Sequence, residues 1–265
     1  MSSKGSSAGK VRLDILVASE TGYSRGFAKE LIVNGNVLVD GKVIMSPGAS
    51  FVKDDIKIKC SPPEKIYVSR GGYKLSKALE YFEIDVEGLT CADIGASTGG
   101  FTDCLLKSGA KKVYAIDNGD GQLDDRLLLD DRVTNIENMN AKELKPDMFS
   151  DVIDFICIDV SFISVTKIIC AVSSMLKPGG ILICLVKPQF EAGRGSLNKR
   201  GIIRGSKGSK ATKNSKSLKV YETVLEQVRV AFNDAGLEHR GFVCSPITGS
   251  DGNVEYLGYF VKVTK

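Results

Sequence analysis

The sequence contains no tryptophan and a single histidine, His239. One imidazole rules out histidine-rich metal sites and disfavours a histidine-based catalytic triad, so we expect no metal ion. The seven cysteines form no C-x-x-C pair, and most of them stand inside apolar runs, where cysteine acts as a small core residue. This usage indicates a reducing compartment, and the cytoplasm is the expected location.

Long hydrophobic runs are also missing. The longest, Ile168–Val172 and Ile181–Val186, fall far short of the ~20 residues that span a bilayer, so no membrane partner is expected. Residues 1–10 (MSSKGSSAGK) lack the apolar core of a signal peptide, and we expect a disordered tail there. A chain of 265 residues, 43% of them hydrophobic and 26% charged, is typical of a soluble protein with one α/β domain and a smaller one.

Residues 11–59 have the pattern of a small α+β unit. Apolar residues recur at helical spacing in two stretches, 11–20 and 24–34. An Asp-Gly pair at 40–41 separates two β-type runs, which predicts a tight hairpin. Residues 55–59 would close the small sheet.

Basic residues on the second of these helices point to RNA as a partner. Arg25 and Lys29 are four positions apart on the exposed helix face, although such a pair can also be an ordinary solvated surface. The unit resembles the S4 domain, an RNA-binding fold, through Arg12-Leu13-Asp14, Ser24-Arg25, Ala28, Leu31-Ile32, Gly35 and the Val-Leu-Val-Asp-Gly hairpin. The resemblance implies that RNA phosphates contact four residues, Arg12, Ser24, Arg25 and Lys29.

The remainder, residues 68–265, follows a predicted linker at 60–67 that contains a proline pair. It alternates strand and helix patterns, which predicts a parallel, Rossmann-like α/β sheet covered on both faces, with ligands at the carboxyl ends of the strands. Pro178-Gly179-Gly180 is expected to break the chain between the helix that ends at 176 and the strand that begins at 181. The last two strands would pair as a closing edge. The predicted strands are 91–94, 112–116, 133–137, 155–159, 181–186, 241–244 and 256–263, and the main helices are 100–108, 164–176 and 218–235.

Residues 91–101 (CADIGASTGGF) are predicted to form a buried strand, a glycine-rich turn and the start of a helix. Small residues let a ligand approach the backbone, and Asp117, about two dozen positions after Asp93, ends the next strand, where a carboxylate reaches a ribose hydroxyl. The turn does not match the G-x-G-x-x-G of dinucleotide enzymes. It matches the looser acidic-x-Gly-x-x-x-Gly turn of S-adenosylmethionine enzymes through Asp93, Gly95 and Gly99, although a purely structural turn would also favour glycine.

Four charged residues stand at strand ends or on a helix of this second domain, Lys74, Asp159, Lys187 and Glu255. Each adjoins a buried run, where an idle ion is unfavourable, although any one alone could be a structural ion-pair partner. Together they suit methyl transfer to a ribose 2′-hydroxyl, because that weak nucleophile must be held in line and must lose its proton. A neighbouring ammonium and partial burial favour a neutral lysine, so we predict Lys187 as the base, with Lys74, Asp159 and Glu255 steering.

Other methylation chemistries fit less well. Methylation of an adenine amino group would favour Asn/Asp-Pro-Pro-Tyr after the fourth strand, where this chain has Asp159-Val-Ser-Phe162. Methylation of a pyrimidine carbon would need a cysteine nucleophile in a cleft, and no cysteine stands in such a context.

A basic stretch, residues 192–221, also favours RNA as the substrate. It holds nine Lys or Arg and no acidic residue, with glycine and serine interleaved, although a solubilising loop is the alternative. The nine are Arg194, Lys199, Arg200, Arg204, Lys207, Lys210, Lys213, Lys216 and Lys219.

Six ordered motifs resemble the TlyA, or hemolysin A, family, an S4 domain fused to an FtsJ-like (RrmJ-like) methyltransferase. They are SRGGYKL (69–75), DIGASTGGFTD (93–103), G-x-GQL (119–123), DVSFIS (159–164), VKPQFE (186–191) and GNVEY (252–256). The resemblance implies S-adenosylmethionine-dependent 2′-O-methylation of cytidine in ribosomal RNA, with 23S rRNA expected and 16S rRNA left open. It implies cofactor contacts by Asp93, Gly95, Ser97, Gly99, Phe101, Asp117, Asn140 and Asp159. Where other members carry an Arg-x-Trp-Val linker, this chain has Lys65-Ile-Tyr-Val68.

The sequence leaves two other functions open. A non-catalytic RNA-binding ribosome assembly factor would keep the basic surfaces but would not need the four charged residues. A membrane-active hemolysin would need an export signal and an amphipathic or membrane-spanning segment, and neither is visible. We therefore favour the enzyme, with ribosomal RNA or ribosomal subunits as its partner and an oligomeric state that the sequence does not indicate.

Overall fold

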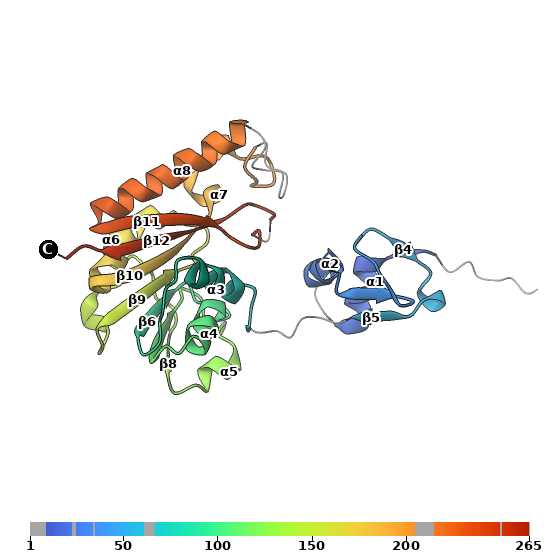
Figure 1. Cartoon of the computed structure of the whole chain (residues 1–265), viewed down its shortest axis with the longest axis horizontal. Coiled ribbons are helices and arrows are strands. Elements are labelled where there is room, and N and C mark those ends of the chain that lie inside the picture. Colours follow the sequence, from blue (N-terminus) through green and yellow to red (C-terminus); the bar gives the residue numbers. More distant parts are fainter. Residues whose placement is uncertain are drawn as a thin grey trace, which may run out of the picture. The chain divides into compact units, whose positions relative to one another are not determined.

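The structure is a computed structural model that describes residues 9–22, 25–33, 35–60, 67–204, 215–249 and 251–264. Most of the predicted tail and the predicted RNA contact Ser24 lie outside these residues. The chain divides into two compact units, Met1–Ile66 and Tyr67–Lys265, and the division falls within the predicted linker. Each unit has a hydrophobic core of its own, and Figure 1 labels their α-helices and many of their strands.

The first unit packs two helices, α1 (Leu13–Thr21) and α2 (Arg25–Val33), against two small sheets. Leu13, Val17 and Ile32 are fully buried in its core. The sheets are formed by β1 (Val11–Arg12) with β4 (Ser50–Phe51), and by β3 (Lys42–Val43), β2 (Val37–Val39) and β5 (Ile58–Cys60) in that order.

The hairpin predicted in this unit is present, and two element boundaries differ. Asp40 and Gly41 have φ values of 49° and 78°, which fits the positive φ that a two-residue hairpin turn needs at both positions. The first helix begins at Leu13, because the two residues before it pair with β4. The closing strand begins only at Ile58, since Lys53–Asp55 form a 3-10 turn, η1.

The second unit is built on a seven-stranded sheet with the order β11-β12-β10-β9-β6-β7-β8. The strands from β10 to β8 are parallel, and β12 runs antiparallel to both β10 and β11, as the sequence predicted for the closing edge. Their bounds are β6 (Thr90–Ile94), β7 (Lys112–Ile116), β8 (Val133–Ile136), β9 (Ile153–Ile158), β10 (Leu176–Val186), β11 (Leu237–Cys244) and β12 (Tyr256–Lys262).

Helices cover both faces of this sheet. They are α3 (Gly71–Tyr81), α4 (Gly100–Lys107), α5 (Asp125–Leu128), α6 (Ile169–Met175), α7 (Pro188–Glu191) and α8 (Ser215–Asp234), with short 3-10 turns η2 (Pro146–Met148), η3 (Val165–Lys167) and η4 (Arg194–Ser196). Helices α3, α4 and α5 share one apolar core with the sheet, and α6 and α8 share the other (Figure 1). The predicted Rossmann-like fold is therefore confirmed.

Two local predictions in this unit were wrong. The helix predicted over 164–176 is divided into η3 and the short α6. The Pro178-Gly179-Gly180 sequence does not separate a helix from a strand, because β10 already begins at Leu176. Its register with β9 shifts between Leu176 and Ile181, and such an irregularity is where a strand tolerates proline.

The strand register gathers the predicted site residues at one edge of the sheet. Ile94, which ends β6, pairs with Ile116 of β7 and Ile158 of β9, so the residues that follow these strands are neighbours. Because β12 runs the opposite way, the pairing of Val186 with Tyr256 brings the end of β10 beside the start of β12. Four residues therefore meet at this edge, Asp117, Asp159, Lys187 and Glu255.

Candidate active site

The loop after β6 approaches the end of β9 so closely that it requires glycine. Gly95 has a φ of 86°, and a Cβ there would lie 2.5 Å from the Asp159 carbonyl oxygen. The loop is also tied to β7, because the Gly95 and Ala96 N–H groups donate to the Ile116 carbonyl at 2.8 and 3.1 Å. Backbone packing thus accounts for this glycine, and the loop forms one wall of a cavity.

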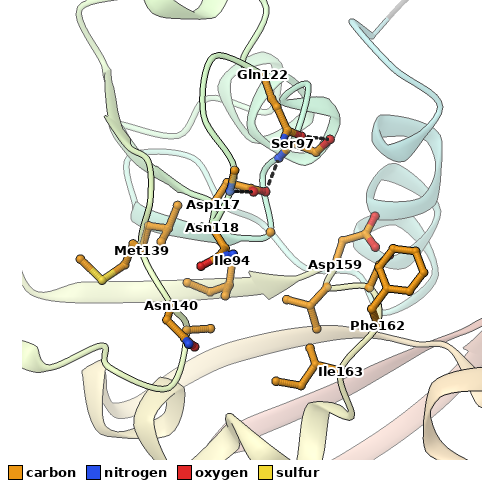
Figure 2. Close-up of a pocket in the computed structure, with 16 residues that line it drawn as sticks. Ile94, Ser97, Asp117, Asn118, Gln122, Met139, Asn140, Asp159, Phe162 and Ile163 are labelled. Atoms are coloured by element: carbon orange, nitrogen blue, oxygen red, sulfur yellow. Dashed lines mark hydrogen bonds between the residues drawn. The ribbon is translucent and has the colours of Figure 1, made fainter.

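The cavity has a volume of about 630 Å³ and lies at the carboxyl ends of β6, β7 and β9 (Figure 2). Asp117 accepts a hydrogen bond from the Ser97 N–H at 2.9 Å and another from the Gly119 N–H at 2.7 Å. The Asn140 side-chain oxygen accepts from the Lys142 N–H at 3.1 Å, so the NH₂ group is the part that can donate to a ligand. Five predicted cofactor residues line the cavity, Gly95, Ser97, Asp117, Asn140 and Asp159.

The other three predicted cofactor residues, Asp93, Gly99 and Phe101, do not line this cavity. Asp93 is fully buried behind the loop, where one carboxylate oxygen accepts from the N–H and the hydroxyl of Thr102 at 2.9 and 2.7 Å. Burial raises the pKa of Asp93 to about 7. Gly99 packs against Leu127, whose Cδ1 would lie 2.1 Å from an added Cβ. Asp93 and Gly99 therefore shape the loop from behind, and Phe101 faces a smaller cavity.

The four charged residues predicted to act together form two ion pairs in the structure. Lys187 Nζ lies 2.6 Å from Asp159 Oδ1 and donates to Ser161 Oγ at 2.7 Å. Lys74, on α3, donates to Glu255 Oε2 at 2.7 Å. The two lysine side chains are each 11% exposed, that of Glu255 is 3% exposed and that of Asp159 is 21% exposed, so the Lys74–Glu255 pair is the better shielded from water.

Two smaller cavities connect these pairs to the large one. The first, of about 190 Å³, is lined by Lys74 and Lys187 together with Gly95, Ser97 and Asp159 of the large cavity. The second, of about 260 Å³, has both lysines and Glu255 among its lining residues. The two ammonium groups therefore lie between a cavity large enough for a nucleoside cofactor and a second opening.

Phe162 is a site residue that the sequence reasoning did not single out. It is 92% exposed and has a φ of 65°, which is a strained conformation for a bulky side chain. Its ring lies 5.3 Å from that of Phe190, and it lines both the large cavity and the 260 Å³ cavity. Ser161, Gln122 and Met139 were also missed, although Phe162 and Ser161 belong to the DVSFIS motif and Gln122 to G-x-GQL.

The predicted RNA contacts of the first unit surround one buried carboxylate. Asp14 is fully buried and lies 3.0 Å from Arg12, 3.1 Å from Arg25 and 3.9 Å from Lys29. The hydrogen bond from Arg12 holds the pKa of Asp14 below its usual value. The three basic side chains are about half exposed, so this surface keeps a net positive charge.

The structure describes the basic stretch of the second unit over residues 192–204 and 215–221. Lys199 and Arg200 are exposed, and Arg204 donates from Nε to the Leu197 carbonyl at 2.9 Å. Lys207, Lys210 and Lys213 lie outside the described residues. Within the part of the chain that the structure describes, no group of His, Cys, Asp and Glu could hold a metal ion, and no helix is long and apolar enough to cross a membrane.

The fold first defines a class of protein. Fibrillarin from Aeropyrum pernix, solved with bound S-adenosyl-L-methionine, superposes with a TM-score of 0.51 over 85% of this chain and 94% of that one. At 18% identity this likeness concerns the fold alone. The sheet therefore has the Rossmann-like fold of that structure.

The family follows from closer matches. The model of the FtsJ-like methyltransferase family matches residues 67–262, and that of the S4 domain matches residues 11–50. The chain belongs to the FtsJ-like methyltransferase family, and it carries an S4 domain before the methyltransferase domain.

Full-length relatives agree with the family resemblance seen in the motifs. Hemolysin A of Brachyspira hyodysenteriae is 44% identical over 254 residues, which cover 95% of this chain and 100% of the relative. The 16S/23S rRNA (cytidine-2′-O)-methyltransferase TlyA of Mycobacterium tuberculosis is 37% identical over 94% of this chain and 89% of its own length. A solved structure of a proposed hemolysin from Streptococcus thermophilus is 39% identical, with a TM-score of 0.73 over 98% of this chain and 90% of that one. The predicted membership of the TlyA family is thus confirmed.

Proposed function

We propose that this protein transfers a methyl group from S-adenosylmethionine to the 2′-hydroxyl of a cytidine in ribosomal RNA. The observation that carries the proposal is the position of Lys187. Its side-chain nitrogen contacts Asp159 and Ser161, and both of these residues line the large cavity beside the glycine loop. The group proposed to accept the proton thus adjoins the cavity proposed to hold the methyl donor.

The large cavity has the polar groups and apolar walls that suit S-adenosylmethionine. The Asp117 carboxylate can accept from ribose hydroxyls, and the Asn140 amide can donate to an adenine nitrogen. Ile94, Met139 and Ile163 supply apolar surface for the adenine ring (Figure 2). When bound, the cofactor supplies a methyl group on a positively charged sulfur.

The two lysines would have different roles in the transfer. Lys187 in its neutral form would take the proton from the attacking hydroxyl, and Asp159 would hold its amine in place. Lys74, fixed by Glu255, lines both of the smaller cavities and would orient the hydroxyl. The contacts with Asp159 and Glu255 hold both lysine side chains in place before substrate binds, so the reaction itself requires little further ordering of them.

Three features support RNA as the substrate class. Phe162 and Phe190 offer aromatic surface at the 260 Å³ cavity, on which an unpaired base could stack. The basic cluster around Asp14 and the basic stretch from Arg194 to Arg204 suit phosphates. Cytidine and ribosomal RNA are proposed from the relatives of M. tuberculosis and Campylobacter jejuni, whose names share 23S rRNA (cytidine-2′-O)-methyltransferase activity. An enzyme with this substrate would work in the cytoplasm.

The test is the transfer of labelled methyl from S-adenosylmethionine to purified 50S and 30S subunits and to free 23S and 16S rRNA. We expect the label in 23S rRNA, presented free or within the 50S subunit. Binding to subunits without any methyl transfer would contradict the proposal and favour an assembly factor. Lysis of red cells by purified protein that methylates no RNA would favour a hemolysin.

A further inference from the structure

Asn253 is a fully buried polar residue in the segment that connects β11 to β12. Its side-chain oxygen accepts from the Ile203 N–H at 3.2 Å, and its NH₂ group donates to the Gly201 carbonyl at 3.1 Å. Both ends of the amide are thus used by the backbone of a segment about fifty positions earlier in the chain. A buried amide is costly without such partners, so this pairing fixes where the earlier segment lies.

The segment that Asn253 holds belongs to the basic stretch and comprises residues 194–204. Ile203 anchors it, fully buried against Tyr221 and Val254. Internal bonds keep the segment compact, because Asn198 Oδ1 accepts from the Arg200 N–H at 2.8 Å, and Leu197 and Ile203 form an antiparallel bridge. Lys199 and Arg200, which belong to this segment, are exposed.

The backbone around Asn253 has a separate connection to the active site. The Asn253 carbonyl accepts from the Gly249 N–H at 2.9 Å, and the Glu255 carbonyl accepts from the Ser245 N–H at 2.9 Å. Gly249 lies against the Glu255 carboxylate, since an added Cβ would come within 2.5 Å of Oε1. These backbone contacts do not involve the amide of Asn253, so a change of that side chain should release the basic segment while Glu255 stays in place.

We infer that Asn253 is a positioning residue whose side chain holds the basic segment, residues 194–204, beside the substrate pocket as a surface for RNA phosphates. The inference rests on the proposed function and adds to it the means by which the surface is held. The anchor lies two residues before Glu255, so phosphates bound by Lys199 and Arg200 would be held in register with the reacting nucleotide. Without the anchor the charges remain on the chain, but their position relative to the pocket is lost.

The experiment compares N253A and N253D with K199A/R200A, which removes charge from the same segment. N135A, at an exposed asparagine of β8, is the matched control. Binding of a ribosomal RNA fragment at several salt concentrations, the Kd for S-adenosylmethionine, and KM and kcat for methyl transfer are measured with the full chain. N253D keeps the oxygen that accepts from Ile203 and nearly the same side-chain volume, but it loses the group that donates to Gly201. Comparison with N253A therefore distinguishes the loss of this hydrogen bond from the creation of a cavity.

We expect both Asn253 variants to raise KM for RNA about tenfold, to change kcat less than about threefold, and to flatten the salt dependence of RNA binding as K199A/R200A does. The Kd for S-adenosylmethionine should stay at the wild-type value, and N135A should behave as wild type. Because the substitutions act on one surface, their effects should not add. The RNA affinity of N253A combined with K199A/R200A should be no lower than that of whichever parent variant, N253A or K199A/R200A, binds RNA less tightly.

Three outcomes would overturn the inference. The first is an additive loss of RNA affinity in the combined variant. The second is a fall in kcat at unchanged KM, which would mean that Asn253 acts by positioning Glu255. The third is a loss of cofactor binding in both Asn253 variants, which would mean that Asn253 only stabilises the fold. Wild-type protein that binds the RNA fragment without methylating it would contradict the proposed function instead. RNA binding by the variants would still decide the role of Asn253 in that case.

Discussion

Lys74 and Glu255 are 181 positions apart in the chain, yet Lys74 Nζ lies 2.7 Å from Glu255 Oε2. The contact joins a helix that precedes β6 to the start of the antiparallel strand β12. Both residues are more than nine-tenths buried, with 9% of Lys74 and 2% of Glu255 exposed. Removing one partner from such a pair leaves an uncompensated buried charge, which costs more than removing both.

The first prediction concerns this pair. K74M and E255Q should each lower the free energy of unfolding, and the double variant should lose less than the sum, with a coupling of about 1–3 kcal/mol. All three should lose methyl transfer, because the hydroxyl is no longer oriented. Urea unfolding followed by fluorescence or circular dichroism gives the coupling, and strictly additive losses would show that the ion pair does not stabilise the fold.

The second prediction concerns the proposed base. K187A should lower kcat by about 10²–10⁴-fold, the usual contribution of a general base, and should leave the Kd for S-adenosylmethionine nearly unchanged. K77A is the control, since Lys77 lies on α3 in an exposed pair with Glu80 at 3.4 Å. Single-turnover methyl transfer and calorimetric cofactor binding measure the two quantities. Turnover by K187A at the rate of K77A would remove Lys187 from the mechanism.

The third prediction concerns RNA binding by the first unit. R25A removes one of the three cations around Asp14, so RNA affinity should fall about 3- to 10-fold for all sequences and the slope of log K against log salt should decrease by about 1. K42A, at an exposed lysine of β3, serves as the control. Fluorescence anisotropy with a labelled rRNA fragment gives both values. An unchanged slope would mean that Arg25 contacts no phosphate.

The fourth prediction concerns pH. The Asp93 pKa is raised by burial from 3.8 to about 7, so between these pH values the folded protein keeps a proton that the unfolded chain releases. The contribution of Asp93 to the free energy of unfolding therefore falls as pH rises from 4 to 7 and is constant above that range. D93N lacks this titration, so its stability relative to wild type should rise over the same window. A relative stability that is flat or falls between pH 4 and 7 would contradict the assignment.

Local chemistry and strand order made much of this architecture readable from the sequence. The Asp40-Gly41 hairpin follows from the two residues that adopt positive φ. Asp159 and Lys187 lie together because parallel strands end at one edge of a sheet and each residue follows such a strand. Glu255 joins them because it precedes β12, which runs antiparallel to β10. The same rule, together with the spacing of about two dozen positions from Asp93, predicted Asp117 at this edge, and Asp117 lines the large cavity.

The parts that were missed depend on packing between distant segments. Asp93 was expected to contact the cofactor, but its side chain points behind the loop to Thr102, and strand alternation alone does not show what lies there. The exposed ring of Phe162 depends on a positive φ that no pattern of aromatic residues predicts. The sequence shows Asn253 only as one residue of the GNVEY motif. Its role could not be predicted, because its partners are backbone carbonyl and N–H groups of residues 201–203.

The most direct test of the account is nucleoside mass spectrometry of ribosomal RNA after incubation with the protein and S-adenosylmethionine, with K187A in parallel. The account predicts that 2′-O-methylcytidine appears in 23S rRNA with wild-type protein and is absent with K187A. A methyl group on a base, or equal 2′-O-methylcytidine from the two proteins, would contradict it.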